Sequence, residues 1–251
     1  MDLQLDGKTA LVTGASSVGL GRAIAVGLAR EGAKVAITAR REDLLRQVAA
    51  QIKAAGGIEP IVIPGDLYVA ETPEKLAQTA RERLGRVDIL INAAGGSRPT
   101  TFDAPPELWE EAMTLNFFRL RALTHAVVRG MREHKWGRVV SLTGTSEPYN
   151  INAANPSKAA IHAWSKGLSR EVAKSGVTVN CIQPGRISSE QMLRMYPTQE
   201  KRDAFTQDVP LGRFGEPDEL ADLAIFLASP RASYITGTVI PVDGGLSRFA
   251  F

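Results

Sequence analysis

A glycine-rich turn near the N-terminus is the first feature of the sequence that could do chemistry. It reads Thr13-Gly14-Ala15-Ser16-Ser17-Val18-Gly19-Leu20-Gly21 and joins an apolar run to a helical pattern. Glycines let the backbone turn tightly, so that N–H groups and the helix N-terminus can meet a pyrophosphate. The strand–turn–helix context therefore predicts a dinucleotide site. The residues expected to contact the dinucleotide are Gly14, Ser16, Ser17, Gly19, Leu20 and Gly21.

Two arginines indicate which dinucleotide is bound. The second apolar run ends in Thr38-Ala39-Arg40-Arg41. NAD-binding folds usually place an acidic residue here for the ribose 2′-hydroxyl, whereas an arginine accommodates the 2′-phosphate of NADP. Exposed arginines at the start of a helix would give the same pattern. Arg40 and Arg41 favour NADP(H), with NAD(H) as the alternative.

The elements that would position these residues alternate along the whole chain. Short apolar runs are separated by helical patterns, which predicts an α/β fold whose parallel sheet is covered on both faces. We expect one catalytic domain over residues 1–251. The segment 187–210 is polar and rich in Met and Gln, and we expect it to form a lid over the substrate. The expected strands are 8–13, 34–39, 58–63, 87–92, 138–143, 177–182 and 238–242, and a long helical region is expected at about 106–134.

Composition excludes several classes of function. The 30 basic and 27 acidic residues are spread along the chain, which argues against a nucleic-acid-binding stripe. Residues 1–6 do not resemble a secretory signal, and no apolar run reaches the roughly 18 residues of a membrane span. We therefore expect a cytoplasmic protein with no membrane partner. The single cysteine, Cys181, and three scattered histidines predict neither a disulfide nor a metal site.

Further motifs resemble those of the short-chain dehydrogenase/reductase family over nearly the whole chain. They are Gly65-Asp66-Leu67, Asn92-Ala93-Ala94-Gly95, Thr114-Leu115-Asn116, Pro184-Gly185, Gly212-Arg213-Phe214-Gly215-Glu216-Pro217 and Val242-Asp243-Gly244-Gly245. The resemblance implies a doubly wound (Rossmann), mostly parallel seven-stranded sheet, and an assembly as a homo-oligomer, usually a tetramer. It implies cofactor contacts from Asp66, Leu67, Asn92, Lys158, Pro184, Gly185, Ile187 and Ser189. It also implies that Asn116 supports a proton-relay water.

The catalytic centre departs from the family pattern. The family uses a tyrosine as proton donor and a lysine four residues later, and i and i+4 share one helix face. Lys158 matches the lysine, but Ala154 stands in the tyrosine position. Alignment on the preceding strand places Gly144 at the catalytic serine, whereas the distance from Ala154 selects Ser141. Thr143, Thr145 or Ser146 could supply the missing hydroxyl, and Thr145 is our candidate.

Other side chains are candidates for the missing proton donor. Tyr149 and Glu147 lie in the short loop before Lys158, and either would have to act from that loop. For His162 and His125, packing roles are favoured. We expect Asn116, Lys158, Thr145 and Tyr149 to form the catalytic group.

The predicted function is an NADP(H)-dependent oxidoreductase with a non-standard proton donor. It would transfer a hydride between the nicotinamide and a small carbonyl/alcohol substrate. Losing a general acid typically costs ~10²–10⁴-fold in rate, which leaves a weaker enzyme rather than none. The alternatives are reduction of a C=C or C=N bond, other chemistry on the same scaffold, and a catalytically silent NADP-binding sensor or partner subunit.

Overall fold

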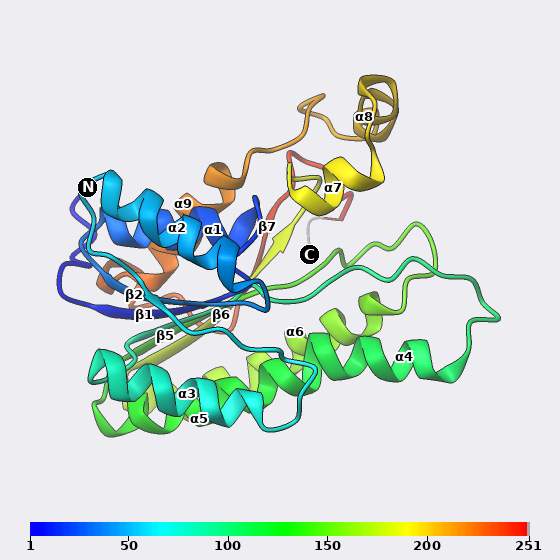
Figure 1. The fold of residues 1–251 in the computed structure, drawn as a ribbon. Coiled ribbons are helices and arrows are strands. Elements are labelled where there is room, and N and C mark those ends of the chain that lie inside the picture. The colour runs from blue at the N-terminus through cyan, green and yellow to red at the C-terminus, as the bar shows by residue number, and fades with distance from the viewer. Residues whose placement is uncertain (250–251) are drawn as a thin grey trace.

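Seven parallel strands form one sheet in the computed structural model, which describes residues 1–249 (Figure 1). Their order across the sheet is β3-β2-β1-β4-β5-β6-β7, and every paired neighbour is parallel. The prediction of a doubly wound, seven-stranded sheet is confirmed. The strands are β1 (Thr9–Thr13), β2 (Lys34–Thr38), β3 (Ile61–Val62), β4 (Ile89–Asn92), β5 (Gly137–Leu142), β6 (Val177–Pro184) and β7 (Val239–Val242).

Helices cover both faces of the sheet (Figure 1). Helices α1, α2 and α9 pack on one face, and α3, α5 and α6 pack on the other. The helices are α1 (Leu20–Arg30), α2 (Glu42–Ala54), α3 (Thr72–Leu84), α4 (Pro106–Met113), α5 (Arg119–Glu133), α6 (Ala154–Val172), α7 (Glu190–Met195), α8 (Gln199–Thr206) and α9 (Pro217–Ala228). None within residues 1–249 is long and apolar enough to cross a bilayer.

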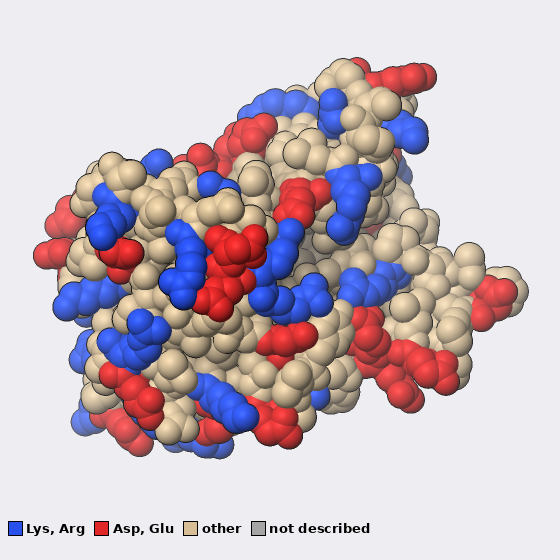
Figure 2. Space-filling model, in the orientation of Figure 1, with Lys and Arg blue, Asp and Glu red and all other residues tan. Residues whose placement is uncertain are grey.

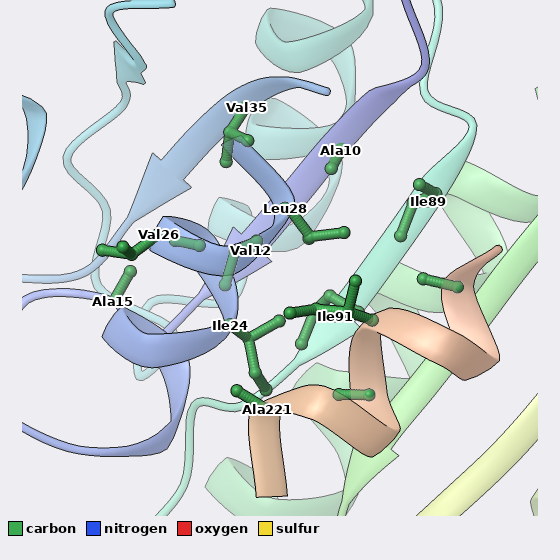
Figure 3. Close-up of a cluster of buried hydrophobic side chains, with 14 of the residues drawn as sticks. Ala10, Val12, Ala15, Ile24, Val26, Leu28, Val35, Ile89, Ile91 and Ala221 are labelled. Carbon is green, nitrogen blue, oxygen red and sulfur yellow. The ribbon is translucent and has the colours of Figure 1, made fainter. Parts of the chain in front are cut away.

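Alternating strand residues supply the two halves of the core. In β1, Ala10 and Val12 face the α1 side, where they pack near Ile24 and Leu28 (Figure 3). Leu11, between them, belongs to the core on the opposite face. Because both faces are buried, the strands read as continuous apolar runs rather than as alternating patterns. The rigid sheet that results fixes the positions of the loops at its carboxyl edge.

The helical region predicted at 106–134 is confirmed, and it contains one irregular turn. A π-helical turn, Thr114–Phe118, separates α4 from α5. The extra residue in the turn rotates the chain, and π-bulges of this kind occur frequently at functional sites. The turn carries Asn116, which is 1% exposed.

The segment 187–210 contains two short helices rather than an irregular loop. Ser189 caps α7 by accepting a hydrogen bond from Met192 N, and Thr198 caps α8 in the same way. The rings of Tyr196 and Phe205 stack at 4.1 Å between centroids and hold the two helices together. In Figure 1 both helices lie beyond the carboxyl ends of the strands, where a lid would have to lie.

Candidate active site

Two adjoining cavities open at the carboxyl edge of the sheet. Their volumes are about 450 and 610 Å³. They lie where the strand order reverses between β1 and β4, which is the general ligand site of open α/β sheets. Figure 2 shows a hollow beneath the α7–α8 segment with basic and acidic side chains beside it, and charges of both signs are interspersed over the rest of that face. Residues that line both cavities are Leu20, Ala93, Gly95, Ser189 and Gln191.

The smaller cavity, called here the nucleotide cavity, brings together most of the predicted cofactor contacts. It is bounded by the glycine-rich turn, the end of β2 and the loop after β3. Its predicted lining residues are Gly14, Ser16, Ser17, Gly19, Leu20, Gly21, Arg40, Arg41, Asp66, Leu67 and Ser189. These residues come from separate βα connections, so the fold assembles the cavity from distant parts of the chain.

Two glycines of the turn are required by close backbone contacts. Gly14 has φ +70°, and a Cβ at this position would lie 2.9 Å from the carbonyl carbon and oxygen of Ala93. A Cβ at Gly21 would lie 2.5 Å from the carbonyl oxygen of Gly14. The absent side chains therefore let α1 begin directly against the end of β1. This arrangement aims the helix N-terminus at the nucleotide cavity.

Arg40 and Arg41 both line the nucleotide cavity but have different partners. The Arg41 guanidinium forms a bidentate ion pair with Glu190 at 2.9 and 2.8 Å, and this pair connects the segment after β2 to helix α7. The hydrogen bond from Arg41 lowers the pKa of the Glu190 carboxyl. Arg40 lies 5.5 Å from the ring centroid of Tyr68. Basic groups thus lie at the end of β2, where the 2′-phosphate of NADP would be held.

The larger cavity, called here the substrate cavity, contains the remaining predicted residues except two. Lys158, Thr145, Tyr149, Pro184, Gly185 and Ile187 line it. Asn92 lies outside the lining, because its buried amide donates to Thr124 Oγ1 at 3.0 Å and to Ser141 Oγ at 3.2 Å. These bonds tie β4 to α5 and β5. Asn116 also lies behind the cavity wall.

Lys158 occupies the space that a serine side chain would need. A Cβ on Gly144 would lie 2.9 Å from Lys158 Cδ. Ser141, the other candidate for the family serine, is fully buried in β5 beside Asn92 and does not line the substrate cavity. Neither candidate places a serine hydroxyl in the cavity.

Burial lowers the pKa of the Lys158 ammonium to about 8. Desolvation disfavours the charged form, and no carboxylate contributes to the shift. Ala154, one helical turn before Lys158, is 1% exposed and forms part of the same wall. A small side chain at this position leaves the ammonium without the phenol expected from the family pattern.

Asn116 is fixed by the π-helical turn. Its Oδ1 accepts from Gly96 N at 3.0 Å and its Nδ2 donates to Ala112 O at 2.9 Å. A Cβ on Gly95 would lie 2.8 Å from Asn116 Oδ1 and 3.4 Å from Lys158 Nζ. Gly95 therefore lies between the two side chains, of which Lys158 lines the cavity and Asn116 lies behind its wall.

The other proposed proton donors differ in accessibility. Tyr149 is 58% exposed and lines the substrate cavity. Thr145 Oγ1 accepts from Glu147 N at 3.0 Å. The Glu147 carboxylate accepts backbone N–H bonds from Arg248 and Phe249, so it braces the C-terminal segment.

The predicted packing histidines lie in the framework around the site. His162 Nε2 lies 2.8 Å from Thr143 Oγ1, and burial lowers the pKa of the imidazole. The His125 ring packs against Trp164 at 5.7 Å between centroids. Neither histidine lines the substrate cavity.

Sequence reasoning missed two residues that shape the site. The Thr13 hydroxyl accepts from the backbone N–H of Ala93 and of Ala94, both at 3.0 Å, and so joins the ends of β1 and β4. Arg186 follows Pro184-Gly185 and lines the substrate cavity with a side chain that is only 9% exposed. A charged residue two positions after the end of a buried strand was the available signal for Arg186.

Comparisons with known proteins extend over nearly the whole chain. A family model described as enoyl-(acyl carrier protein) reductase matches residues 14–247. The 3-oxoacyl-[acyl-carrier-protein] reductase of Aquifex aeolicus (strain VF5) is 35% identical over 250 residues, which cover 98% of this chain and 100% of the relative.

Two solved structures of reductases also resemble the chain over nearly its full length. YwfH, an NADPH-dependent reductase involved in bacilysin biosynthesis, superposes with a TM-score of 0.92 at 31% identity, over 96% of this chain and 99% of its own. The L-sorbose reductase of Gluconobacter frateurii, solved with NADPH and L-sorbose, gives a TM-score of 0.93 at 31% identity, over 99% and 100% of the two chains.

Proposed function

The chain belongs to the short-chain dehydrogenase/reductase family, and from this premise we propose that it is an NADP(H)-dependent carbonyl reductase or alcohol dehydrogenase with a non-standard proton donor. The observation that carries the proposal is the pair of adjoining cavities. One has the shape and charge for a dinucleotide, and the other brings Lys158 to the wall of a substrate site.

The residues of the nucleotide cavity fit NADP(H). Gly14 and Gly21 leave the close backbone approach that a pyrophosphate needs, and Arg40 and Arg41 offer two guanidiniums for the 2′-phosphate. YwfH and L-sorbose reductase, which the chain resembles over almost its full length, are described with NADPH. When bound, the cofactor supplies or accepts the hydride.

Lys158 is the proton donor that the geometry supports best. Its pKa of about 8 keeps the ammonium mostly protonated at pH 7. The same pKa lies close enough to the working pH for the ammonium to donate its proton efficiently. Ala154 keeps the neighbouring wall free of a large side chain, so a water or a substrate oxygen can reach the ammonium. Gly144 gives the lysine stem the space it occupies. Asn116 Oδ1 holds the backbone at Gly96, next to Gly95, and a Cβ on Gly95 would lie 3.4 Å from Lys158 Nζ.

Tyr149 is the alternative donor. Its ring lines the substrate cavity and is exposed, but it comes from the loop before α6 rather than from the helix that carries Lys158. A donor on a loop is held less rigidly, and a displacement of about 1 Å can cost ~10²-fold in rate. The Tyr149→Phe variant separates the two assignments.

A second candidate function is reduction of a C=C bond. The matching family model is described as an enoyl-(acyl carrier protein) reductase. Reduction of an enone or enoyl group also needs a hydride and a proton, but the proton goes to carbon. The absence of a tyrosine at position 154 and of a serine at position 144 is compatible with that demand.

The first experiment is NADPH consumption, with NADH in parallel, across ketones, aldehydes, enones and imines. We expect NADPH-dependent turnover of carbonyl compounds. Turnover of enones alone would replace the carbonyl assignment with the second candidate. NADPH binding without turnover of any compound would contradict both and favour a cofactor-binding sensor.

Assembly and location follow the same proposal. We propose a homo-oligomer, a tetramer or a dimer, in the cytoplasm. Analytical ultracentrifugation of the purified chain tests the first part, and fractionation of the source cells tests the second.

A further inference from the structure

One charged side chain in the substrate cavity is unexplained by hydride and proton transfer. The Arg186 side chain is only 9% exposed. Among residues 1–249 its one ionic partner is Asp208, at a distance of 3.5 Å from Arg186 Nη2 to Asp208 Oδ2. Its Nη1 is buried there with no hydrogen-bond partner. Burying a guanidinium without a close anion is costly, so native structures usually provide one.

The surroundings of Arg186 form a site open to an anion. Its Cζ lies 4.0 Å from the ring centroid of Phe205 and 5.8 Å from that of Tyr149, so two aromatic rings hold the guanidinium. All three residues line the substrate cavity together with Lys158. The rings offer no hydrogen-bond acceptor for the guanidinium N–H groups, so these donors remain available for a planar ligand.

Asp208 has the character of a replaceable partner. Its carboxylate is 53% exposed, and it lies at the end of the lid segment rather than in the sheet. A contact of 3.5 Å is weaker than the 2.7–2.9 Å that a charge-assisted hydrogen bond prefers. The other carboxylate of the cavity wall, Asp243, is already bonded to Ser247 and Gly245. A ligand carboxylate could therefore take the place of Asp208 and improve on it.

We propose that Arg186 binds a carboxylate of the substrate in place of Asp208, which makes the substrate a carbonyl compound that carries a carboxylate. That the bound carboxylate compound is reduced rests on the proposed function, whereas the binding of a carboxylate by Arg186 does not. Arg186 is the residue that decides this specificity, and Lys158 is left to serve the reacting carbonyl.

Matched pairs of ligands test the proposal. Aliphatic and phenyl-substituted 2-, 4- and 5-oxo acids are compared with their methyl esters as substrates for the NADPH-loaded enzyme. We expect kcat/KM to favour the acids, and the Arg186→Gln variant to lower that preference by about 10²-fold, as for the loss of a buried bond to a charged group. Arg186→Lys retains the positive charge but not the paired N–H donors of the guanidinium, and its preference for acids over esters should be intermediate. Asp208→Asn, the matched control, should strengthen the preference.

A binding measurement makes the result independent of turnover. Phenylacetate, 3-phenylpropionate and 4-phenylbutyrate are titrated calorimetrically into the NADPH complex, with their primary amides as references. Carboxylate binding that Arg186→Gln abolishes supports the proposal even if no oxo acid is reduced, in which case the proposed function alone fails. Equal use of acids and esters, or carboxylate binding unchanged in Arg186→Gln, overturns the proposal and leaves the reductase assignment intact.

Discussion

The pH dependence of reduction should be governed by Lys158. Desolvation lowers the pKa of its ammonium from the ordinary 10.5 to about 8, and the reductive reaction needs the protonated form. The active fraction is then roughly nine-tenths at pH 7 and roughly one-tenth at pH 9. We therefore expect kcat/KM for reduction to fall about tenfold between these pH values. Oxidation of the corresponding alcohol needs the neutral amine and should rise over the same range.

The assay is steady-state NADPH oxidation from pH 6 to 10 at saturating cofactor, with three variants. Lys158→Arg keeps a cation whose pKa lies well above the range of the assay, so the inflection near pH 8 should disappear while NADPH still binds. Tyr149→Phe and Thr145→Ala should retain the inflection. The reasoning is refuted if Lys158→Arg still shows the inflection, or if Tyr149→Phe removes it.

Three further outcomes follow from the same geometry. Lys158→Met should stabilise the protein by about 1–2 kcal/mol at pH 7, because the folded state no longer carries a desolvated cation. Thermal denaturation should show the full stabilisation below pH 8 and none by about pH 10.5, where the lysine is neutral in both the folded and the unfolded state. Gly14→Ala should lower the free energy of unfolding by at least about 2 kcal/mol, because the alanine would have a positive φ and its Cβ would overlap the backbone of Ala93. Gly56→Ala, at φ +84° in open space, should lower it by only about 1 kcal/mol. Urea unfolding measures both variants, and equal decreases would argue against the close contact at Gly14. Glu190→Gln should tighten NADPH binding about 2- to 10-fold and leave NADH binding unchanged, because the Glu190 carboxylate no longer competes with the 2′-phosphate for Arg41. Parallel fluorescence titrations measure both affinities, and a similar change for NADH would exclude this competition.

The fold could be predicted because its signals are local. Each buried parallel strand is a short apolar run, and each helix between strands has an apolar stripe, so period and length are visible in the chain itself. Strand β3 was predicted over six residues and is only Ile61–Val62, since sheet pairing rather than composition decides how far a strand extends. The π-helical turn at Asn116 and the helices α7 and α8 were not predicted, because they depend on packing against the rest of the site.

The sequence by itself determined the glycine-rich turn, the basic pair after β2 and the absence of a tyrosine four residues before Lys158. These are identities and short spacings, and their chemistry does not depend on distant contacts. Only the tertiary structure decided that Gly144 lies against the stem of Lys158, that Arg41 binds Glu190, and that Arg186 is buried beside Phe205. Each of these contacts joins residues from different elements or loops, and burial and desolvation arise only when those elements pack together.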